Sequence, residues 1–185
     1  MTETSAYTLE DLRSAVKGGR KPDYLFFWGH KPKQADRVCK ACLSQWWPTR
    51  FRVDRVTFET AEHWMMAEKA RLFGDKKIYQ KVLNAPDPKT AKALGRQVNA
   101  FNSRVWDRHK FDIVVAGNQH KFSQNPALKA FLLGTGQQVL VEASPVDPVW
   151  GIGLSQSDRR AYDPSQWQGP NLLGFALMRV RDTLV

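Results

Sequence analysis

The chain has 185 residues and carries 28 Lys and Arg against 18 Asp and Glu, a formal net charge of +10 at pH 7. Hydrophobic residues make up 42% and charged residues 25%, which is ordinary for one folded globular domain. No apolar run approaches the roughly 20 residues that cross a bilayer, so no membrane association is expected. A positive field attracts polyanions, which favours phosphorylated metabolites, nucleotides or nucleic acid as ligands.

The cysteine content and the first residues bear on compartment and metal binding. Only Cys39 and Cys42 are present, so a disulfide scaffold is not expected. Their CxxC spacing supplies two of the four ligands of a structural zinc site, and no second pair follows, so no metal site is predicted. The first residues lack a basic segment followed by an apolar one, so no secretory signal is expected. We therefore predict a cytoplasmic protein.

In chain order, the hydrophobic pattern predicts an α+β fold that is mainly α, a single compact helical domain with a few short antiparallel strands. Residues 1–23 are expected to be an N-terminal extension with one short helix, and residues 24–185 the domain itself. Strands are expected at 24–28, as an antiparallel pair within 51–58, and at 138–142. Helices are expected at 57–75, 75–83, 88–101, 104–124, 126–134 and 172–184. The polar segment 156–169 is expected to be a mobile loop.

The helix predicted at 57–75 carries the strongest chemical pattern. Thr57 or Thr60 can cap its start, and Gly74 is placed where a left-handed residue would end it. Glu62, Met66 and Lys69 follow helical spacing and share one side of the helix. An ordinary amphipathic helix with a solvated ion ladder explains this pattern, and so does a functional pair of charges.

A series of short motifs continues this pattern along the chain. The motifs are LSQWWP at 43–48, AEHWMMAEKARLFGD at 61–75, GR at 95–96, Trp106, KF at 121–122, LVEAS at 140–144, DPVWGIG at 147–153, NLLG at 171–174, LM at 177–178 and Arg181. Each motif is short, but the ordered set is specific. Over roughly residues 24–184 the chain resembles the NADAR domain, also called the YbiA-like family.

The resemblance implies a compact, mostly helical N-glycosidase that cuts the bond between a ribose C1′ and a nitrogen, with no metal or organic cofactor. One group of family members acts on phosphorylated ribosylamino intermediates of riboflavin synthesis, and another removes ADP-ribose from guanine in nucleic acid. The implied partner is therefore a phosphorylated ribosyl small molecule or an ADP-ribosylated nucleic acid. Two departures stand out: Gln45 replaces a frequent Asn, and Ile152 stands where some members have an Asp and cannot act as an acid.

Cleavage of a ribosyl C–N bond passes through a state with positive charge on the sugar, which a carboxylate can stabilise while it orients or deprotonates water. We assign that role to Glu62, with Asp147 as the second carboxylate. Lys69 is expected to be an electrostatic partner of Glu62 or a phosphate ligand. Arg96 is a phosphate candidate, or else a partner in an internal ion pair.

Flat aromatic faces can stack the base or the ribose, and glycine lets the backbone approach a substrate closely. Trp150 and either Trp46 or Trp47 are the stacking candidates, although the two adjacent indoles also suit a core corner. The remaining substrate-binding candidates are Gly151, Gly153 and Asn171. Asn171 is equally suited to cap the last helix. Glu142 is interpreted as structural.

Three functions remain open at this point. The first is hydrolysis of small phosphorylated N-ribosides, and the second is removal of ADP-ribose from guanine in DNA or RNA, which the net charge of +10 favours mildly. The third is a non-catalytic module that only binds ADP-ribose or a nucleotide. Two acids in one anion-binding pocket argue against the third.

Overall fold

Helices dominate residues 7–31 and 37–184, which the computed structural model describes. The α-helices in these ranges are α1 (Leu9–Lys17), α2 (Ala61–Leu72), α3 (Lys76–Leu83), α4 (Pro88–Gly95), α5 (Ser103–Ser123), α6 (Pro126–Gly134) and α7 (Leu172–Thr183). The strands are β1 (Tyr24–Phe27), β2 (Phe51–Val53), β3 (Val56–Phe58) and β4 (Val139–Glu142). Short 3₁₀ helices lie at η1 (Lys40–Leu43), η2 (Arg159–Tyr162) and η3 (Pro164–Gln166). The prediction of a mainly helical α+β fold is confirmed.

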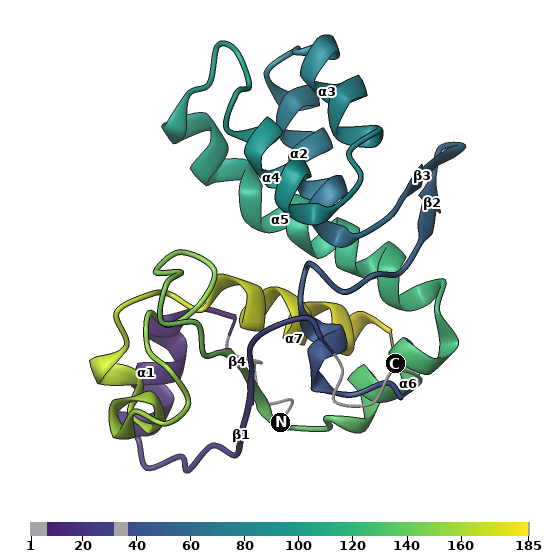
Figure 1. Cartoon of the computed structure of the whole chain (residues 1–185). Coiled ribbons are helices and arrows are strands. Elements are labelled where there is room, and N and C mark those ends of the chain that lie inside the picture. Colours follow the sequence, from purple (N-terminus) through teal and green to yellow (C-terminus); the bar gives the residue numbers. More distant parts are fainter. Residues whose placement is uncertain (1–6, 32–36, 185) are drawn as a thin grey trace.

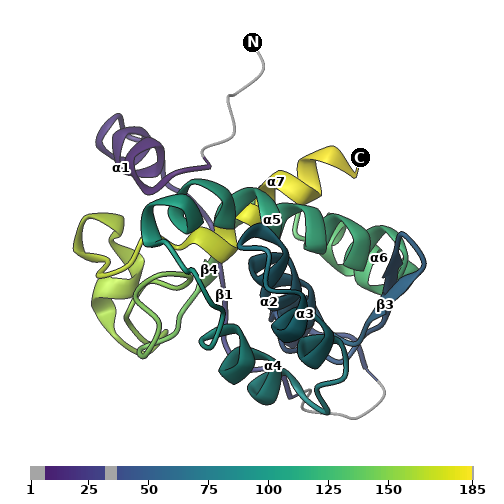
Figure 2. The ribbon, with the colours of Figure 1, turned by 90° about the horizontal axis from the view of Figure 1, so that it is seen from above.

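The elements form a continuous stack in which each one covers the next (Figures 1 and 2). Helices α3 and α4 pack on α2, α2 packs on the long helix α5, and α5 runs beside α7. Helix α7 in turn covers β4, which pairs with β1. The core is therefore continuous from α3 to the β1–β4 pair, and α2 lies inside it.

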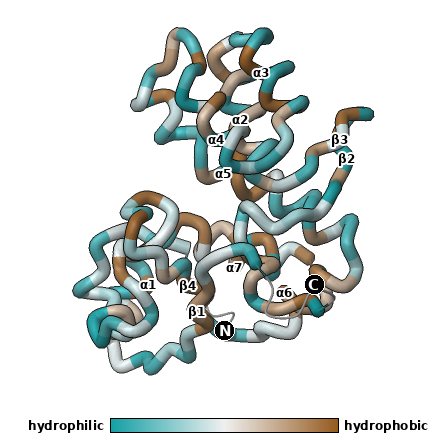
Figure 3. The backbone as a smooth tube through the Cα atoms, viewed as in Figure 1, coloured by the Kyte–Doolittle hydropathy of each residue, from teal (hydrophilic) through white to brown (hydrophobic). Residues whose placement is uncertain are grey.

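The strands form two separate pairs of opposite kind. β2 and β3 make the predicted antiparallel hairpin, in which Phe51 lies opposite Phe58. β1 and β4 are parallel, with Tyr24 opposite Val139 and Phe27 opposite Glu142, so the prediction of antiparallel strands alone was wrong. Figure 3 shows the hydrophobic residues along β1, where Phe26 and Phe27 are buried. A parallel pair needs a long crossover, and helices α2 to α6 supply it.

Two helices are shorter than the sequence pattern predicted. Helix α2 begins at Ala61, because Phe58 belongs to β3 and its ring stacks on Phe51 at 5.7 Å. Thr60 is its N-cap and accepts a hydrogen bond from the His63 backbone N–H. Helix α4 ends at Gly95 rather than near residue 101. A Cβ on Gly95 would lie 2.0 Å from the Met66 sulfur, so this glycine lets α4 approach α2.

Helix α1 and the segment 156–169 are both packed against the rest of the described chain. Leu12 of α1 is fully buried, and Arg13 Nε donates to the Pro164 carbonyl at 2.8 Å. Trp167 is also buried, and its indole N–H donates to the Ala161 carbonyl at 2.8 Å. The expectation of a mobile loop at 156–169 was wrong, because a buried indole and two 3₁₀ turns hold it in place.

The contact of α2 with α5 depends on the absence of a side chain at Gly117. A Cβ there would lie 2.3 Å from Trp64 Cδ1, and the Trp64 indole is held by a 2.8 Å hydrogen bond to the Ile113 carbonyl. Gly117→Ala should therefore lower the free energy of unfolding by about 1–3 kcal/mol, measured by urea denaturation. Gly134→Ala is the matched control, because no atom lies within 4 Å of a Cβ there and alanine favours the helix. Equal stability of the two variants would contradict the close packing of α2 on α5.

Candidate active site

Helix α2 is buried on almost every side, which rules out the solvated ion ladder. Nine of its residues are buried, and the Glu62 side chain is among them with 2% exposure. Glu62, Met65, Met66 and Lys69 line one cavity, so a single face of α2 forms its wall. A carboxylate in this position loses most of its hydration, which is costly unless it is compensated or used.

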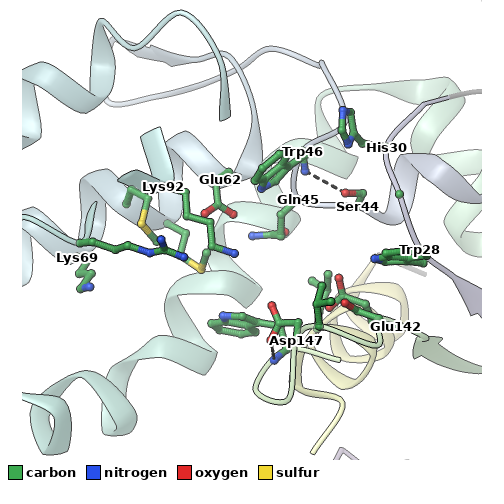
Figure 4. A pocket seen from close by; sticks show the side chains of 18 of the residues that line it. Trp28, His30, Ser44, Gln45, Trp46, Glu62, Lys69, Lys92, Glu142 and Asp147 are labelled. Atoms are coloured by element: carbon green, nitrogen blue, oxygen red, sulfur yellow. Dashed lines mark hydrogen bonds between the residues drawn. The ribbon is translucent and has the colours of Figure 1, made fainter. Parts of the chain in front are cut away.

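The cavity has a volume of about 580 Å³, within the range of small-molecule sites. Acids, cations and tryptophans gather in it from segments that are far apart in the sequence. The acids are Glu62, Glu142 and Asp147; the cations are Lys69, Lys92 and Arg96; the indoles are Trp28, Trp46, Trp106 and Trp150. Figure 4 shows Glu62 on one side of the cavity, with Glu142 and Asp147 on the other.

Unpartnered polar atoms point to this cavity as a place where a ligand is recognised. Within residues 7–31 and 37–184, four buried side-chain nitrogen or oxygen atoms have no hydrogen-bond partner. Three of them belong to residues that line the cavity: Glu62 Oε1, Glu142 Oε2 and Gln45 Nε2. Buried polar groups are normally paired, so these atoms are available to a substrate or to water.

The loop that carries Gln45 and Trp46 is fixed from two directions. Lys121 of α5 is fully buried, and its ammonium donates to the carbonyls of Cys42 at 2.6 Å and Ser44 at 2.8 Å. The Glu62 backbone N–H donates to the Gln45 carbonyl at 3.0 Å, which satisfies a free donor in the first turn of α2. The loop, α5 and the start of α2 therefore hold one another in register.

The opposite wall is the end of β4 and the loop that follows it. The Asp147 Oδ1 atom accepts the backbone N–H groups of Val149 at 3.0 Å and Trp150 at 2.8 Å, which closes a tight turn. Asn171 holds the edge of β4: its Oδ1 accepts from the Glu142 N–H at 2.9 Å and its Nδ2 donates to the Leu140 carbonyl at 2.8 Å. This wall is therefore built on backbone hydrogen bonds.

Burial dominates the electrostatics of Glu62. It raises the pKa of Glu62 from its usual 4.5 to about 7. The positive charge of Lys92, a hydrogen bond from the Trp46 side chain and the charge of Arg96 lower this pKa, whereas the Asp147 carboxylate raises it. The local cations therefore favour the ionised form against the cost of burial.

Lys69 does not have the place that the sequence suggested beside Glu62. Its ammonium lies over the Phe101 ring, 4.2 Å from the centroid, and burial and the charge of Arg96 lower its pKa. The cations that act on Glu62 are Lys92 and Arg96 of α4 and its C-cap. The proposed electrostatic pairing of Glu62 with Lys69 was wrong. Lys69 is two helical turns beyond Glu62 on α2, and it lies at the end of the cavity that is opposite Trp28 (Figure 4).

Four predicted substrate-binding residues lie outside the cavity lining. Trp47 packs against the hydrophobic core. A Cβ on Gly151 would lie 2.7 Å from the Glu142 carbonyl, and one on Gly153 would lie 2.9 Å from the Gln168 side chain. Both glycines therefore permit close packing between segments of this protein. Asn171 is used on β4 and makes no side-chain cap, although it precedes α7 in a left-handed conformation. Glu62, Asp147, Trp46, Lys69, Arg96 and Trp150 do line the cavity.

Several lining residues were not singled out by the sequence interpretation as ligands. Lys92 could have been found, since it lies four residues before Arg96 on a predicted helix. Trp106 belonged to a matching motif but had no role assigned. Glu142 was interpreted as structural, yet it lies across the cavity from Glu62 (Figure 4). Trp28, 59% exposed, gave no signal because a short aromatic strand normally indicates core.

Two further properties concern metals and membranes. Among the residues whose positions are described, no three His, Cys, Asp or Glu side chains are grouped so as to hold a metal ion. Cys42 is buried, and burial raises the pKa of its thiol to about 12. Helices long and apolar enough to span a bilayer are absent from the same ranges.

Comparisons with known proteins give a consistent result. A family model described as the NADAR domain matches residues 26–185. The chain is 43% identical to N-glycosidase R617 of Acanthamoeba polyphaga mimivirus over 86% of this chain and 95% of that protein. It is 30% identical to N-glycosidase YbiA of Escherichia coli over 75% of this chain and 76% of that protein. An NMR structure of the E. coli protein YbiA superposes with a TM-score of 0.70 at 25% identity, covering 89% of this chain and 86% of that one.

The raised pKa of Glu62 predicts a pH-dependent cost to stability. The folded chain favours the neutral carboxyl, so the free energy of unfolding falls as pH rises from about 4.5, where Glu62 ionises in the unfolded chain, to about 7. Glu62→Gln does not titrate. It should therefore gain stability relative to the unmodified protein over this window, by up to about 3 kcal/mol. Urea denaturation of both proteins between pH 4 and 8 measures the difference, and a constant difference would contradict the shifted pKa.

Proposed function

The chain belongs to the NADAR domain family, and we propose that it is an N-glycosidase that hydrolyses the C1′–N bond of phosphorylated N-ribosides. The observation that carries this proposal is the Glu62 carboxylate: it is buried in the cavity wall with one unpaired oxygen and cations nearby. Such a group stabilises the positive charge that develops on the ribose. Relatives named N-glycosidases support the same reaction class.

The distribution of charge in the cavity supports a phosphorylated substrate. Lys69 of α2 and Lys92 of α4 lie on one side of the cavity (Figure 4), and Arg96, the C-cap of α4, also lines it. Phosphate oxygens form short charge-assisted hydrogen bonds with such groups. Trp46 and Trp28 lie toward the other side, where a flat base can stack (Figure 4). The ribose of a bound N-riboside would then lie between these two regions, beneath Glu62.

A second candidate substrate is ADP-ribosylated guanine in nucleic acid. The net charge of +10 favours it, and so do Trp28 and Val146, which line the cavity and are 59% and 79% exposed. An open rim of this kind leaves room for a strand outside the cavity. A panel of ribosylaminopyrimidine phosphate, NAD and ADP-ribosylated guanine in DNA and RNA, assayed by the released base, separates the candidates. A module that only binds nucleotides would release no base from any of them.

The role of Glu62 is tested by Glu62→Gln, which keeps the size and removes the charge. Turnover should fall by at least about a hundredfold, the lower range for a positioned acid–base group. Glu59→Gln is the matched control, because Glu59 pairs with Arg50 at 2.8 Å on the surface and does not line this cavity. Circular dichroism and thermal unfolding establish that both variants are folded. Near-normal turnover of folded Glu62→Gln would remove Glu62 from the reaction.

The phosphate site is tested by Lys69→Met, because Lys69 does not act on the pKa of Glu62. Loss of one charge-assisted hydrogen bond, worth about 1.5–3 kcal/mol, should raise KM for a phosphorylated substrate roughly ten- to hundredfold and leave kcat nearly unchanged. The dephosphorylated substrate should show no such change. Lys89→Met is the matched control, since Lys89 is exposed on α4 and does not line the cavity. An equal rise in KM for both substrates would place the phosphate elsewhere.

A further inference from the structure

The main chain of Glu142 is fixed on every side. Its backbone N–H donates to Asn171 Oδ1 at 2.9 Å, and its carbonyl accepts from the Ile152 N–H at 3.0 Å. Glu142 also lies opposite Phe27 in the β1–β4 pair. The side chain reaches the cavity, where Oε2 is buried and is one of the few unpartnered side-chain oxygens of the described residues. A rigid anchor with one free polar end suits a group that acts on a substrate.

The charges that face Glu142 differ from those that face Glu62. Burial raises the pKa of Glu142 to about 8, and the Asp147 carboxylate raises it, Lys92 of α4 lowers it and Glu62 of α2 raises it. Glu142 thus faces two carboxylates and one cation. Glu62 faces Asp147 and, in return, Glu142, but it also faces two cations and the Trp46 indole. Two acids in one pocket are therefore pushed toward different protonation states, the arrangement that separates an acid from a base.

Hydrolysis of an N-riboside needs both states at once. The C1′–N bond breaks with its electron pair moving to nitrogen, and a nitrogen that leaves as an amine or amide must gain a proton. A water oxygen then bonds to C1′ and gives up a proton. An ionised Glu62 cannot supply the first proton, so a second group in the cavity has to donate it.

We propose that the Glu142 carboxyl group donates the proton to the leaving nitrogen, while Glu62 on the opposite wall faces the ribose and accepts the proton of the attacking water. The net reaction consumes one water and releases the ribose and the protonated base. Glu142 regains its proton and Glu62 loses its own to solvent afterwards. This inference rests on the proposed N-glycosidase function. It gives the substrate a direction, with phosphate toward Lys69 and the base toward Trp28, on the side of Glu142 (Figure 4).

The test compares two leaving groups in the folded, full-length protein. On an N-riboside 5′-phosphate whose nitrogen needs a proton, Glu142→Gln should lower kcat at least about a hundredfold. On p-nitrophenyl riboside 5-phosphate, whose phenolate leaves without a proton, the loss should be less than about tenfold. Glu62→Gln should lower both rates, because it acts on the ribose. The decline of kcat on the alkaline side of the pH profile should also disappear in Glu142→Gln.

The outcomes separate the inference from the function on which it rests. If the unmodified protein cleaves N-ribosides, two results would show that Glu142 is not the proton donor. In the first, folded Glu142→Gln is as active as the unmodified protein. In the second, its kcat falls by the same factor on both substrates. If the unmodified protein cleaves no N-riboside, the proposed function itself fails. Glu142→Asp keeps an acid at this position and guards against a folding defect: it should retain the alkaline decline, and its disappearance there would also overturn the inference.

Discussion

The buried ammonium of Lys121 is the interaction on which the site depends most. It is fully enclosed, and burial lowers its pKa to about 7. Its hydrogen bonds to the carbonyls of Cys42 and Ser44 join α5 to the loop that carries Gln45 and Trp46. The Gln45 carbonyl in turn receives the Glu62 N–H. The charge of Lys121 therefore fixes the loop with Trp46, the start of α2 and the position of the Glu62 carboxylate. A buried charge is stable only in a geometry that satisfies its hydrogen bonds.

The buried carboxylates of the cavity lower the stability of the fold. Glu62 and Glu142 are both held where burial raises their pKa, and both keep an unpaired oxygen. Groups of this kind destabilise the folded state at neutral pH, and surrounding packing has to offset them. The dense contact of α2 with α5 at Gly117, and the hydrogen bonds of Asn171 to β4, supply such packing in the two elements that carry Glu62 and Glu142. The tightly held elements α2 and β4 are therefore also the elements that carry the two destabilising carboxylates.

The capping signals in the sequence were interpreted correctly, and the long-range relations were not. The caps at Thr60, Asp75 and Asp87 and the left-handed Gly74 all lie where short-range rules place them, because each needs only a few neighbouring residues. The parallel pairing of β1 with β4 was missed, since helices α2 to α6 separate the two strands in the sequence and neither strand carries a register signal.

The same difference between local and long-range relations applies to the residues of the candidate site. Glu62, Lys69 and Met66 were placed on one face by helical spacing, and all three line the cavity. Glu142 could not be recognised, because its character comes from Asp147, Lys92 and Glu62, which only tertiary structure brings to it. Asn171 shows the opposite error. Its place in a matching motif predicted a substrate-binding residue, whereas its amide makes its hydrogen bonds to the β4 backbone.

The parallel β1–β4 pair also has a consequence for the order of assembly. The hairpin β2–β3 and the contacts of α2 with α3 and α4 join neighbouring segments, whereas Tyr24 pairs with Val139 only after α2 to α6 have been traversed. Closing so long a loop carries a large entropic cost, and such non-local contacts slow folding. This pairing, together with α7 and Asn171, holds the end of β4 opposite α2. A partly folded chain that has its local helix contacts but not this pairing therefore lacks the arrangement in which Glu62 and Glu142 face each other across the cavity.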